Sequence, residues 1–210
     1  GVQTCALPIF ALVHVPGDPT PYALNSSGWA GSHNTPETVG GTEMPMFGPH
    51  AVTIPGCVAG WVALHDRFGR LPFDPLLSPA RALAEEGFFA SEEYTGAMER
   101  KGHELVGQPI SEEMLPGDGP PPVGTRIRRP SLARTLRRIA EHGAAGFYEG
   151  HVALQVSGAV GNLITTDDLA EFDPEWVRPL GKEVLGLTAW TIPPNAQGYL
   201  TLRSEEHTSE

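Results

Sequence analysis

Apolar residues recur at helical spacing between residues 57 and 68. Five side chains on this stretch lie three or four positions apart: Val58, Trp61, Val62, His65 and Phe68. Such spacing places them on one face of a helix. Pro55-Gly56 precedes the helix and is typical of a turn, and Gly69 suits the left-handed position that ends a helix. Residues 51–54 include three β-branched residues, so the pattern predicts a short strand, a tight turn and a helix.

Helix-end signals predict further helices downstream. Ser78-Pro79 suits an N-cap followed by proline at the first helical position, which predicts a helix over residues 80–86 that ends at Gly87. Ser131 is expected to cap another helix, and Gly143 is expected to end it. The buried face expected for that helix comprises Leu132, Leu136, Ile139 and Ala140.

Short apolar runs bounded by turn residues predict strands. Residues 10–15 and 22–25 flank a proline-rich turn and are expected to pair with each other. Residues 183–187 and 187–192 are also typical of strands, with Gly186 as a candidate bulge. Residues 34–49 are polar and rich in glycine and proline, so a long surface loop is expected there.

Two blocks of short motifs follow one another along the chain. The first block consists of Ile54-Pro55-Gly56, Ala59-Gly60-Trp61, Leu71-Pro72 and the run PARALAEEGF over residues 79–88. The second consists of GAAGFYEG over residues 143–150, GNLITTDDL over residues 161–169 and PPNAQG over residues 193–198. Together they resemble the large subunit of the γ-glutamyltranspeptidase family. Its members show V-P-G-x-x-A-G-W, P-A-x-x-L-A-x-x-G-F, G-x-x-x-F-Y-x-G, G-x-L-T-x-x-D-L and P-P-x-x-x-G in this order.

The resemblance implies an α+β fold. It would be part of the αββα sandwich of the N-terminal-nucleophile hydrolases, in which two β-sheets lie between helix layers. The resemblance covers residues 10–202, which we interpret as a fragment of the large subunit. Residues 1–9 and 203–210 match nothing in the family and resemble translated sequencing-adapter DNA, so they are predicted to be non-native tails. The alternative is that both are ordinary variable termini.

The family's chemistry depends on a residue that this chain does not contain. A precursor cuts itself and exposes a Thr at the start of the small subunit, and the hydroxyl of this Thr attacks the γ-glutamyl carbonyl of glutathione or a similar amide. The resemblance therefore implies a nucleophile downstream of this chain, no catalytic residue within it, and no cofactor. The implied partners are a small-molecule amide and the small subunit of the same precursor, and the chain by itself is predicted to be inactive. Family members are often periplasmic or extracellular and some are cytoplasmic, and nothing in this sequence selects a compartment.

The candidate substrate-binding residues follow the second predicted strand. Members of the family specific for γ-glutamyl groups bind the substrate α-carboxylate there through an Arg, whose guanidinium suits a bidentate contact. Alignment on Ala23-Leu24 places Ser27 at this position, whereas a branch of family-like hydrolases with the segment N-G-S-G-R-A-P places Trp29 on its Arg. No Arg stands between Pro21 and Trp61. This absence leaves open an acylase for a non-glutamyl amide, or a non-catalytic homologue kept as a scaffold.

Charge and residue spacing argue against several other classes. The 210 residues carry 25 Asp and Glu against 14 Lys and Arg, a net charge of −11, whereas a nucleic acid partner needs clustered positive charge. No apolar run approaches the roughly 20 residues of a membrane helix. The eight His residues show no H-x-x-x-H spacing and no C-x-x-C pair occurs, so no metal site is expected. Asp167-Asp168 stand at a predicted helix start and are expected to be capping groups.

Overall fold

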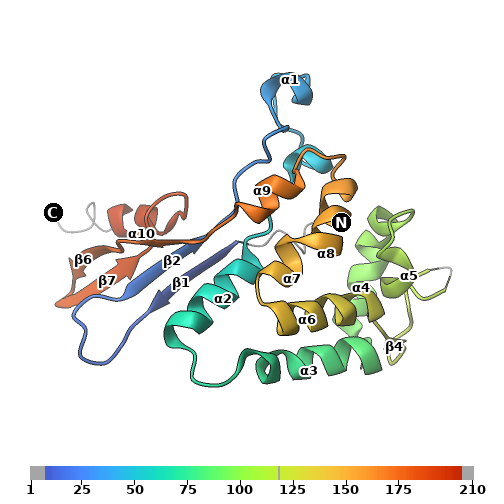
Figure 1. Cartoon of the computed structure of the whole chain (residues 1–210), viewed down its shortest axis with the longest axis horizontal. Helices are drawn as coiled ribbons and strands as arrows, with labels where there is room; N and C mark the ends of the chain where they lie inside the picture. Colours follow the sequence, from blue (N-terminus) through green and yellow to red (C-terminus); the bar gives the residue numbers. More distant parts are fainter. Residues whose placement is uncertain (1–7, 118, 205–210) are drawn as a thin grey trace. The chain divides into compact units, whose positions relative to one another are not determined.

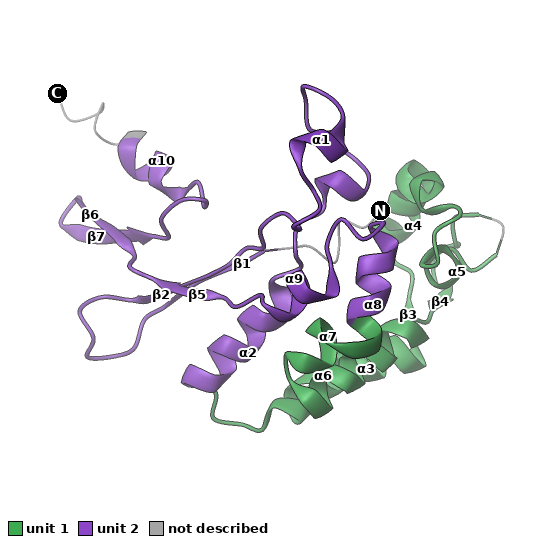
Figure 2. Ribbon diagram, turned by 45° about the horizontal axis from the view of Figure 1, so that its top comes forward, with its two compact units in different colours: residues 1, 69–152 green, residues 2–68, 153–210 purple. Residues whose placement is uncertain are grey.

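The computed structural model describes residues 8–117 and 119–204. These residues form two compact units, which are coloured separately in Figure 2. One is the continuous stretch Gly69–Val152, here called the helical unit. The other, here called the sheet unit, combines the described residues up to Phe68 with those from Ala153 onward. The chain therefore leaves the sheet unit after Phe68 and later returns to it.

The sheet unit contains two antiparallel sheets and several helices (Figure 1). Its elements in chain order are β1 (Ile9–Val13), β2 (Tyr22–Ser26), α1 (Pro36–Val39), η2 (Pro49–Ala51), α2 (Cys57–Phe68), α9 (Thr166–Ala170), β5 (Glu175–Val177), β6 (Leu180–Val184), β7 (Leu187–Thr191) and α10 (Gly198–Ser204). One sheet has the order β1-β2-β5, and β6 pairs with β7 in the other. The predicted pairing of the first two strands is confirmed, since Ala11 lies opposite Leu24. Helix α8 (Gly150–Ala159) begins in the helical unit and ends in the sheet unit.

Strand β2 is the centre of the sheet unit because it pairs on both sides and packs against α2. Leu24 is fully buried, and the buried Ser26 donates its Oγ hydrogen to the carbonyl oxygen of Gly56 at 2.7 Å. A Cβ at Gly56 would lie 2.0 Å from the carbonyl oxygen of Ser26, and a Cβ at Gly60 would lie 3.0 Å from the Ser26 Cβ. The glycines of the Pro-Gly-x-x-Ala-Gly motif therefore allow α2 to begin directly against β2.

The strand predicted over residues 51–54 is not formed. The chain makes a short 3₁₀ turn, η2, and then continues as irregular backbone up to α2. Ile54 makes one backbone hydrogen bond across to another segment, from its N–H to the carbonyl oxygen of Trp29 at 3.0 Å. The Ile54 side chain is fully buried, so this β-branched residue serves packing rather than a strand ladder.

The helix predicted over residues 57–68 is confirmed by α2, but the predicted left-handed backbone at Gly69 is wrong. Gly69 is not among the residues with positive φ. The predicted long loop over residues 34–49 contains the single helical turn α1, which Thr35 caps through its hydroxyl, and reaches η2 at its last residue. Most of the loop is exposed, as expected for a surface connection.

Two packed helices, α3 (Phe73–Glu86) and α6 (Pro130–His142), form the body of the helical unit. The smaller elements of this unit are β3 (Phe88–Phe89), α4 (Glu92–Lys101), η3 (Gly102–Leu105), α5 (Ser111–Met114), β4 (Arg126–Ile127) and α7 (Ala145–Tyr148). Residues 80–86 are helical as predicted, but the predicted cap at Ser78 is wrong, because α3 already begins at Phe73 and continues through Pro79. Proline removes one backbone donor from a helix, but α3 packs on α6, which supports the helix despite this loss. Gly87 ends α3 as predicted, with φ at +97°.

Helix α6 starts two residues earlier than a cap at Ser131 would give, with Pro130 at its first position. Ser131 is not the cap. Its N–H donates to Glu113 Oε1 at 2.8 Å, so a carboxylate from α5 accepts a backbone hydrogen bond at the N-terminus of α6. Ala133, Leu136 and Ile139 are buried, whereas Leu132 is 37% exposed and Ala140 only half-buried. The helix ends at Gly143 with φ at +60°, as predicted.

The β6–β7 hairpin turns through Leu185 and Gly186, whose φ angles are +52° and +78°. Two central residues with positive φ are typical of a type I′ turn. The two predicted strands are therefore present, but Gly186 lies in their connecting turn and the predicted bulge is wrong.

Candidate functional site

The candidate substrate-binding residues Ser27 and Trp29 lie on the segment that leaves the carboxyl end of β2. The N–H and the Oγ of Ser27 both donate to Asn25 Oδ1, at 3.0 Å and 2.8 Å. The Trp29 indole packs on Phe172 with ring centroids 5.0 Å apart, and the residue remains 47% exposed. Ser27 and Trp29 are thus on one segment but have different neighbours.

A residue from the far end of the chain joins Ser27. Asn195, in the loop between β7 and α10, places its Oδ1 3.1 Å from Ser27 Oγ and 3.2 Å from Asn25 Nδ2. Its Nδ2 donates to Ser27 Oγ at 2.8 Å. We call Asn25, Ser27 and Asn195 the polar cluster.

The polar cluster is neutral and has spare hydrogen-bond donors. The single hydroxyl hydrogen of Ser27 is donated to Asn25 Oδ1 or Asn195 Oδ1, and its oxygen accepts from Asn195 Nδ2. Each amide nitrogen carries two hydrogens, and within residues 8–117 and 119–204 only one of each pair has an acceptor. The cluster can therefore donate two further hydrogen bonds to a carbonyl, carboxamide or carboxylate oxygen of a bound molecule.

Glycines on both sides of Trp29 hold its segment close to neighbouring backbone. A Cβ at Gly28 would lie 1.8 Å from the carbonyl oxygen of Ile54, and a Cβ at Gly31 would lie 2.1 Å from that of Leu163. Any larger residue at either position would displace main chain, because backbone atoms cannot move aside as a flexible side chain can. Residues 27–33 therefore have a defined path between Ile54 on one side and Leu163 on the other.

Asp168 was predicted to be a capping group, and the structure gives it a second contact. Its Oδ2 accepts from the N–H of Thr165 at 2.8 Å, which confirms the cap of α9. The same oxygen accepts from the N–H and the Oγ of Ser32, both at 3.0 Å. Burial by itself raises the pKa of Asp168, but these hydrogen bonds outweigh it and lower the pKa below its ordinary value. A charged carboxylate thus links the segment after β2 to α9.

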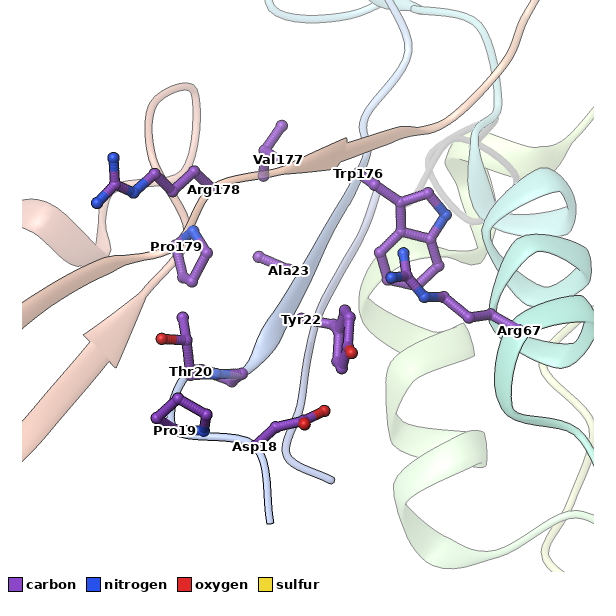
Figure 3. A pocket seen from close by; sticks show the side chains of 11 residues that line it. Asp18, Pro19, Thr20, Tyr22, Ala23, Arg67, Trp176, Val177, Arg178 and Pro179 are labelled. Carbon is purple, nitrogen blue, oxygen red and sulfur yellow. The ribbon is translucent and has the colours of Figure 1, made fainter. Parts of the chain in front are cut away.

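A separate, open pocket lies at the other end of β2 (Figure 3). Its lining comes from the loop before β2, from α2 and from the end of β5: Asp18, Pro19, Thr20, Pro21, Tyr22, Ala23, Arg67, Trp176, Val177, Arg178 and Pro179. The Arg67 guanidinium carbon lies 4.2 Å from the ring centre of Tyr22 and 4.4 Å from that of Trp176. Through these two cation–π contacts, the last turn of α2 packs against β2 and β5. The pocket includes neither Ser27 nor Trp29.

Across the described parts of the chain, no group of three or more His, Cys, Asp or Glu residues is placed to hold a metal ion. Among the helices that the structure describes, none has the length and apolar character needed to cross a membrane.

Sequence reasoning identified Ser27 but missed the two asparagines that contact it. Asn195 is 168 residues from Ser27 along the chain, so no local pattern connects them. The one available signal was the PPNAQG loop, in which Asn195 stands next to a turn-forming Pro-Pro pair. The structure brings Ser27 into the polar cluster and places Trp29 against Phe172 instead. Their role in substrate binding stays a prediction.

Comparison with known protein families matches residues 9–204 to Gamma-glutamyltranspeptidase. The chain is 36% identical over 200 residues to the oxamate amidohydrolase proenzyme of Klebsiella pneumoniae, and 33% identical over 184 residues to the glutathione hydrolase-like YwrD proenzyme of Bacillus subtilis. These alignments cover 90% and 85% of this chain, but 38% and 35% of the relatives. The chain thus spans little more than a third of the length of these curated relatives.

Solved structures show the same relationship at the level of the fold. The cephalosporin acylase from Bacillus halodurans is similar with a TM-score of 0.86 and 34% sequence identity, covering 95% of this chain and 40% of the acylase chain. The predicted α+β class and N-terminal-nucleophile hydrolase fold are confirmed, with this chain providing part of that fold. The predicted division at residues 10 and 202 stays a prediction, while β1 starts at Ile9 and α10 reaches Ser204.

Proposed function

Because the chain belongs to the γ-glutamyltranspeptidase family, we propose that it is the large-subunit part of an enzyme that transfers or hydrolyses the γ-glutamyl group of glutathione-like amides. The observation that carries this proposal is the family match over nearly all described residues. The names of the relatives, which include a glutathione hydrolase-like proenzyme and an amidohydrolase proenzyme, support amide chemistry in a self-processed precursor.

The proposed reaction proceeds through an ester on a Thr that follows this chain in the precursor. The Thr hydroxyl attacks the amide carbonyl, its proton passes through the α-amine of the Thr to the leaving nitrogen, and the amine product departs. Water or the amine of an amino acid then attacks the ester carbonyl, releases the acyl group and returns a proton to the Thr oxygen. Hydrogen-bond donors that face the carbonyl oxygen stabilise the negative charge that develops there.

The proposed contribution of this chain is to bind the acyl group. The segment that follows β2 presents the Ser27 hydroxyl and the spare amide hydrogens of Asn25 and Asn195. Trp29 adds an exposed aromatic surface on the same segment. Packing of Gly28 and Gly31 against neighbouring backbone keeps this segment in place, which favours a preorganised subsite.

The neutral polar cluster favours a second candidate, an acylase for a non-glutamyl amide. A guanidinium binds a carboxylate through two charge-assisted hydrogen bonds, and no Lys or Arg occurs between residues 22 and 60. Uncharged N–H donors stabilise a carboxylate less, and they suit a carboxamide or carbonyl oxygen. The likeness to a cephalosporin acylase and to an oxamate amidohydrolase is in keeping with acyl groups other than γ-glutamyl.

The experiment that tests both candidates uses the complete precursor containing this segment, purified after self-processing. Release of p-nitroaniline is measured with three anilides of similar length: γ-glutamyl, glutaryl and the neutral 4-carbamoylbutanoyl derivative. The first carries a carboxylate and an amine, the second a carboxylate alone, and the third neither charge. Ser27→Arg and Ser27→Ala serve as a matched pair, because the former adds the missing guanidinium at the candidate position and the latter removes only the hydroxyl.

The ranking of kcat/KM separates the outcomes. The γ-glutamyl candidate predicts the highest value for the γ-glutamyl anilide. The acylase candidate predicts the highest value for one of the two non-glutamyl anilides, with the neutral one favoured by the uncharged cluster, and a shift toward the charged anilides in Ser27→Arg. Absence of self-processing and of p-nitroaniline release from all three would refute the enzyme proposal and leave a non-catalytic homologue.

A further inference from the structure

Asp168 is the carboxylate that accepts hydrogen bonds from the candidate acyl-binding segment. Its Oδ2 holds both the N–H and the Oγ of Ser32, while the same oxygen also accepts from Thr165 N–H. A carboxylate only accepts hydrogen bonds when ionised, so it satisfies three donors that converge on one oxygen. An Asn side chain would present an N–H group or a weaker neutral acceptor to the same donors.

Three further contacts join the same two segments beside that of Asp168. His33 Nδ1 lies 3.1 Å from the carbonyl oxygen of Asn162, Gly31 packs against the main chain of Leu163 and Ile164, and Trp29 packs on Phe172 with tilted rings. Residues 162–172 therefore form a platform along which residues 29–33 lie. Asp168 is at the middle of this platform and is the only member that contributes an ionised group to the segment.

We propose that Asp168 is a positioning residue, which fixes Trp29 and Ser27 in the geometry that binds the acyl group and thereby sets acyl specificity. This inference rests on the proposed function for its consequence in catalysis. Its structural part, the placement of Trp29 by Asp168, rests on the hydrogen bonds to Ser32 alone. Asp168 contacts no reacting atom in this account and acts through the segment that it holds.

Thr165 offers a matched control for the simpler role of helix capping. Its Oγ1 accepts from the N–H of Asp168 at 3.0 Å and completes the reciprocal cap of α9. Thr165→Ala removes this half of the cap and leaves the Asp168 bonds to Ser32 intact. Asp168→Ala removes both the cap contact to Thr165 and the hydrogen bonds to Ser32. Ser32→Ala removes only the hydroxyl bond, and Ser32→Thr keeps a hydroxyl and should restore it, so this pair tests the contact without deleting the cap.

The test combines kinetics with a direct report on Trp29 in the complete self-processed enzyme. The enzyme is labelled with 5-fluorotryptophan, and the ¹⁹F resonance of Trp29 is assigned from its loss in Trp29→Phe. For Asp168→Ala we expect a shifted or broadened Trp29 resonance and a KM for the preferred anilide about tenfold higher, with kcat changed less than twofold. Ser32→Ala should show a smaller change in the same direction, Ser32→Thr should reverse it, and Thr165→Ala should show neither effect.

Every other outcome overturns either the inference about Asp168 or the proposed function. If Thr165→Ala and Asp168→Ala give the same Trp29 spectrum and the same KM, Asp168 is only a cap and the inference fails while the proposed function stands. If Trp29 moves and KM does not, the segment does not determine acyl binding, and the inference again fails. If the wild-type enzyme releases p-nitroaniline from none of the three anilides, the proposed function fails, and the specificity role fails with it. The Trp29 spectrum is measured independently of activity, so the two failures are distinguishable.

Discussion

Gly56→Ala is expected to destabilise the sheet unit because it adds a methyl group where α2 touches β2. The added Cβ would lie 2.0 Å from the carbonyl oxygen of Ser26 and 2.8 Å from its carbonyl carbon. Ordinary van der Waals contact begins at 3.4 Å, so backbone must separate by about 1.4 Å. Gly56 does not have positive φ, and the backbone therefore permits alanine. The close approach is then the only cause of the expected effect.

Two effects set the expected decrease in the free energy of unfolding: overpacking and a weakened hydrogen bond. Overpacking of this kind typically costs about 1–3 kcal/mol. Separation also stretches the bond from Ser26 Oγ to the Gly56 carbonyl oxygen, now 2.7 Å, and a buried hydrogen bond is worth about 1 kcal/mol. We therefore expect Gly56→Ala to lower the free energy of unfolding by about 2–4 kcal/mol, a large share of the roughly 5–15 kcal/mol typical of a domain.

The assay is urea unfolding of the purified chain followed by far-UV circular dichroism, with Gly158→Ala as the control. Gly158 lies in α8 and nothing stands within 4 Å of an added Cβ, so alanine there should be neutral or stabilising by up to about 1 kcal/mol. A free energy of unfolding for Gly56→Ala within about 0.5 kcal/mol of the wild type would refute the argument that glycine is needed for the approach of α2 to β2.

Three further predictions concern single side chains. Leu185→Asn should raise the urea midpoint, because Leu185 is 98% exposed at φ +52° and Asn-Gly suits a type I′ turn; an unchanged or lower midpoint would contradict this. Because hydrogen bonds lower the pKa of Asp168 below 3.8 in the folded chain, its stabilising contribution is present above that value and lost as pH falls through the folded pKa. Asp168→Asn should therefore show a flatter loss of stability in acid than the wild type in a pH series of thermal unfolding, and an identical slope would count against the contact. Arg67→Ala should lower stability by about 1 kcal/mol through the lost stacking on Tyr22 and Trp176, whereas Tyr22→Phe, which keeps the ring, should have little effect; equal losses in a paired urea titration would exclude the cation–π account.

Elements with strong local signals were predictable from sequence. α2 follows from apolar spacing after a Pro-Gly turn, and β1 and β2 follow from two apolar runs on either side of a turn. Where tertiary packing decided, sequence reasoning failed. Pro79 looked like a helix start, yet α3 continues through it because the helix packs on α6. Residues 51–54 had strand composition, but only Ile54 among them is buried, and it makes one backbone bond to Trp29 and no ladder.

The candidate site was predictable only in part, because tertiary contacts between distant parts of the sequence also determine it. The resemblance led to Ser27 and Trp29, because their position after a strand is local information. Asn195 and Asp168 reach this segment from distant parts of the sequence, through hydrogen bonds that no spacing rule anticipates. The capping role of Asp168 was predictable from its place at a helix start, whereas its bonds to Ser32 required the fold.

The central claim is that this chain forms part of an amide-cleaving acyl-transfer enzyme, and intact-mass spectrometry tests it most directly. The complete self-processed enzyme is mixed with the preferred anilide and quenched in acid within the first turnover. The account predicts a small subunit heavier by one acyl group, formed together with one equivalent of p-nitroaniline, and an unmodified large subunit. Release of p-nitroaniline without any acylated small subunit, or acylation on the segment described here, would contradict it.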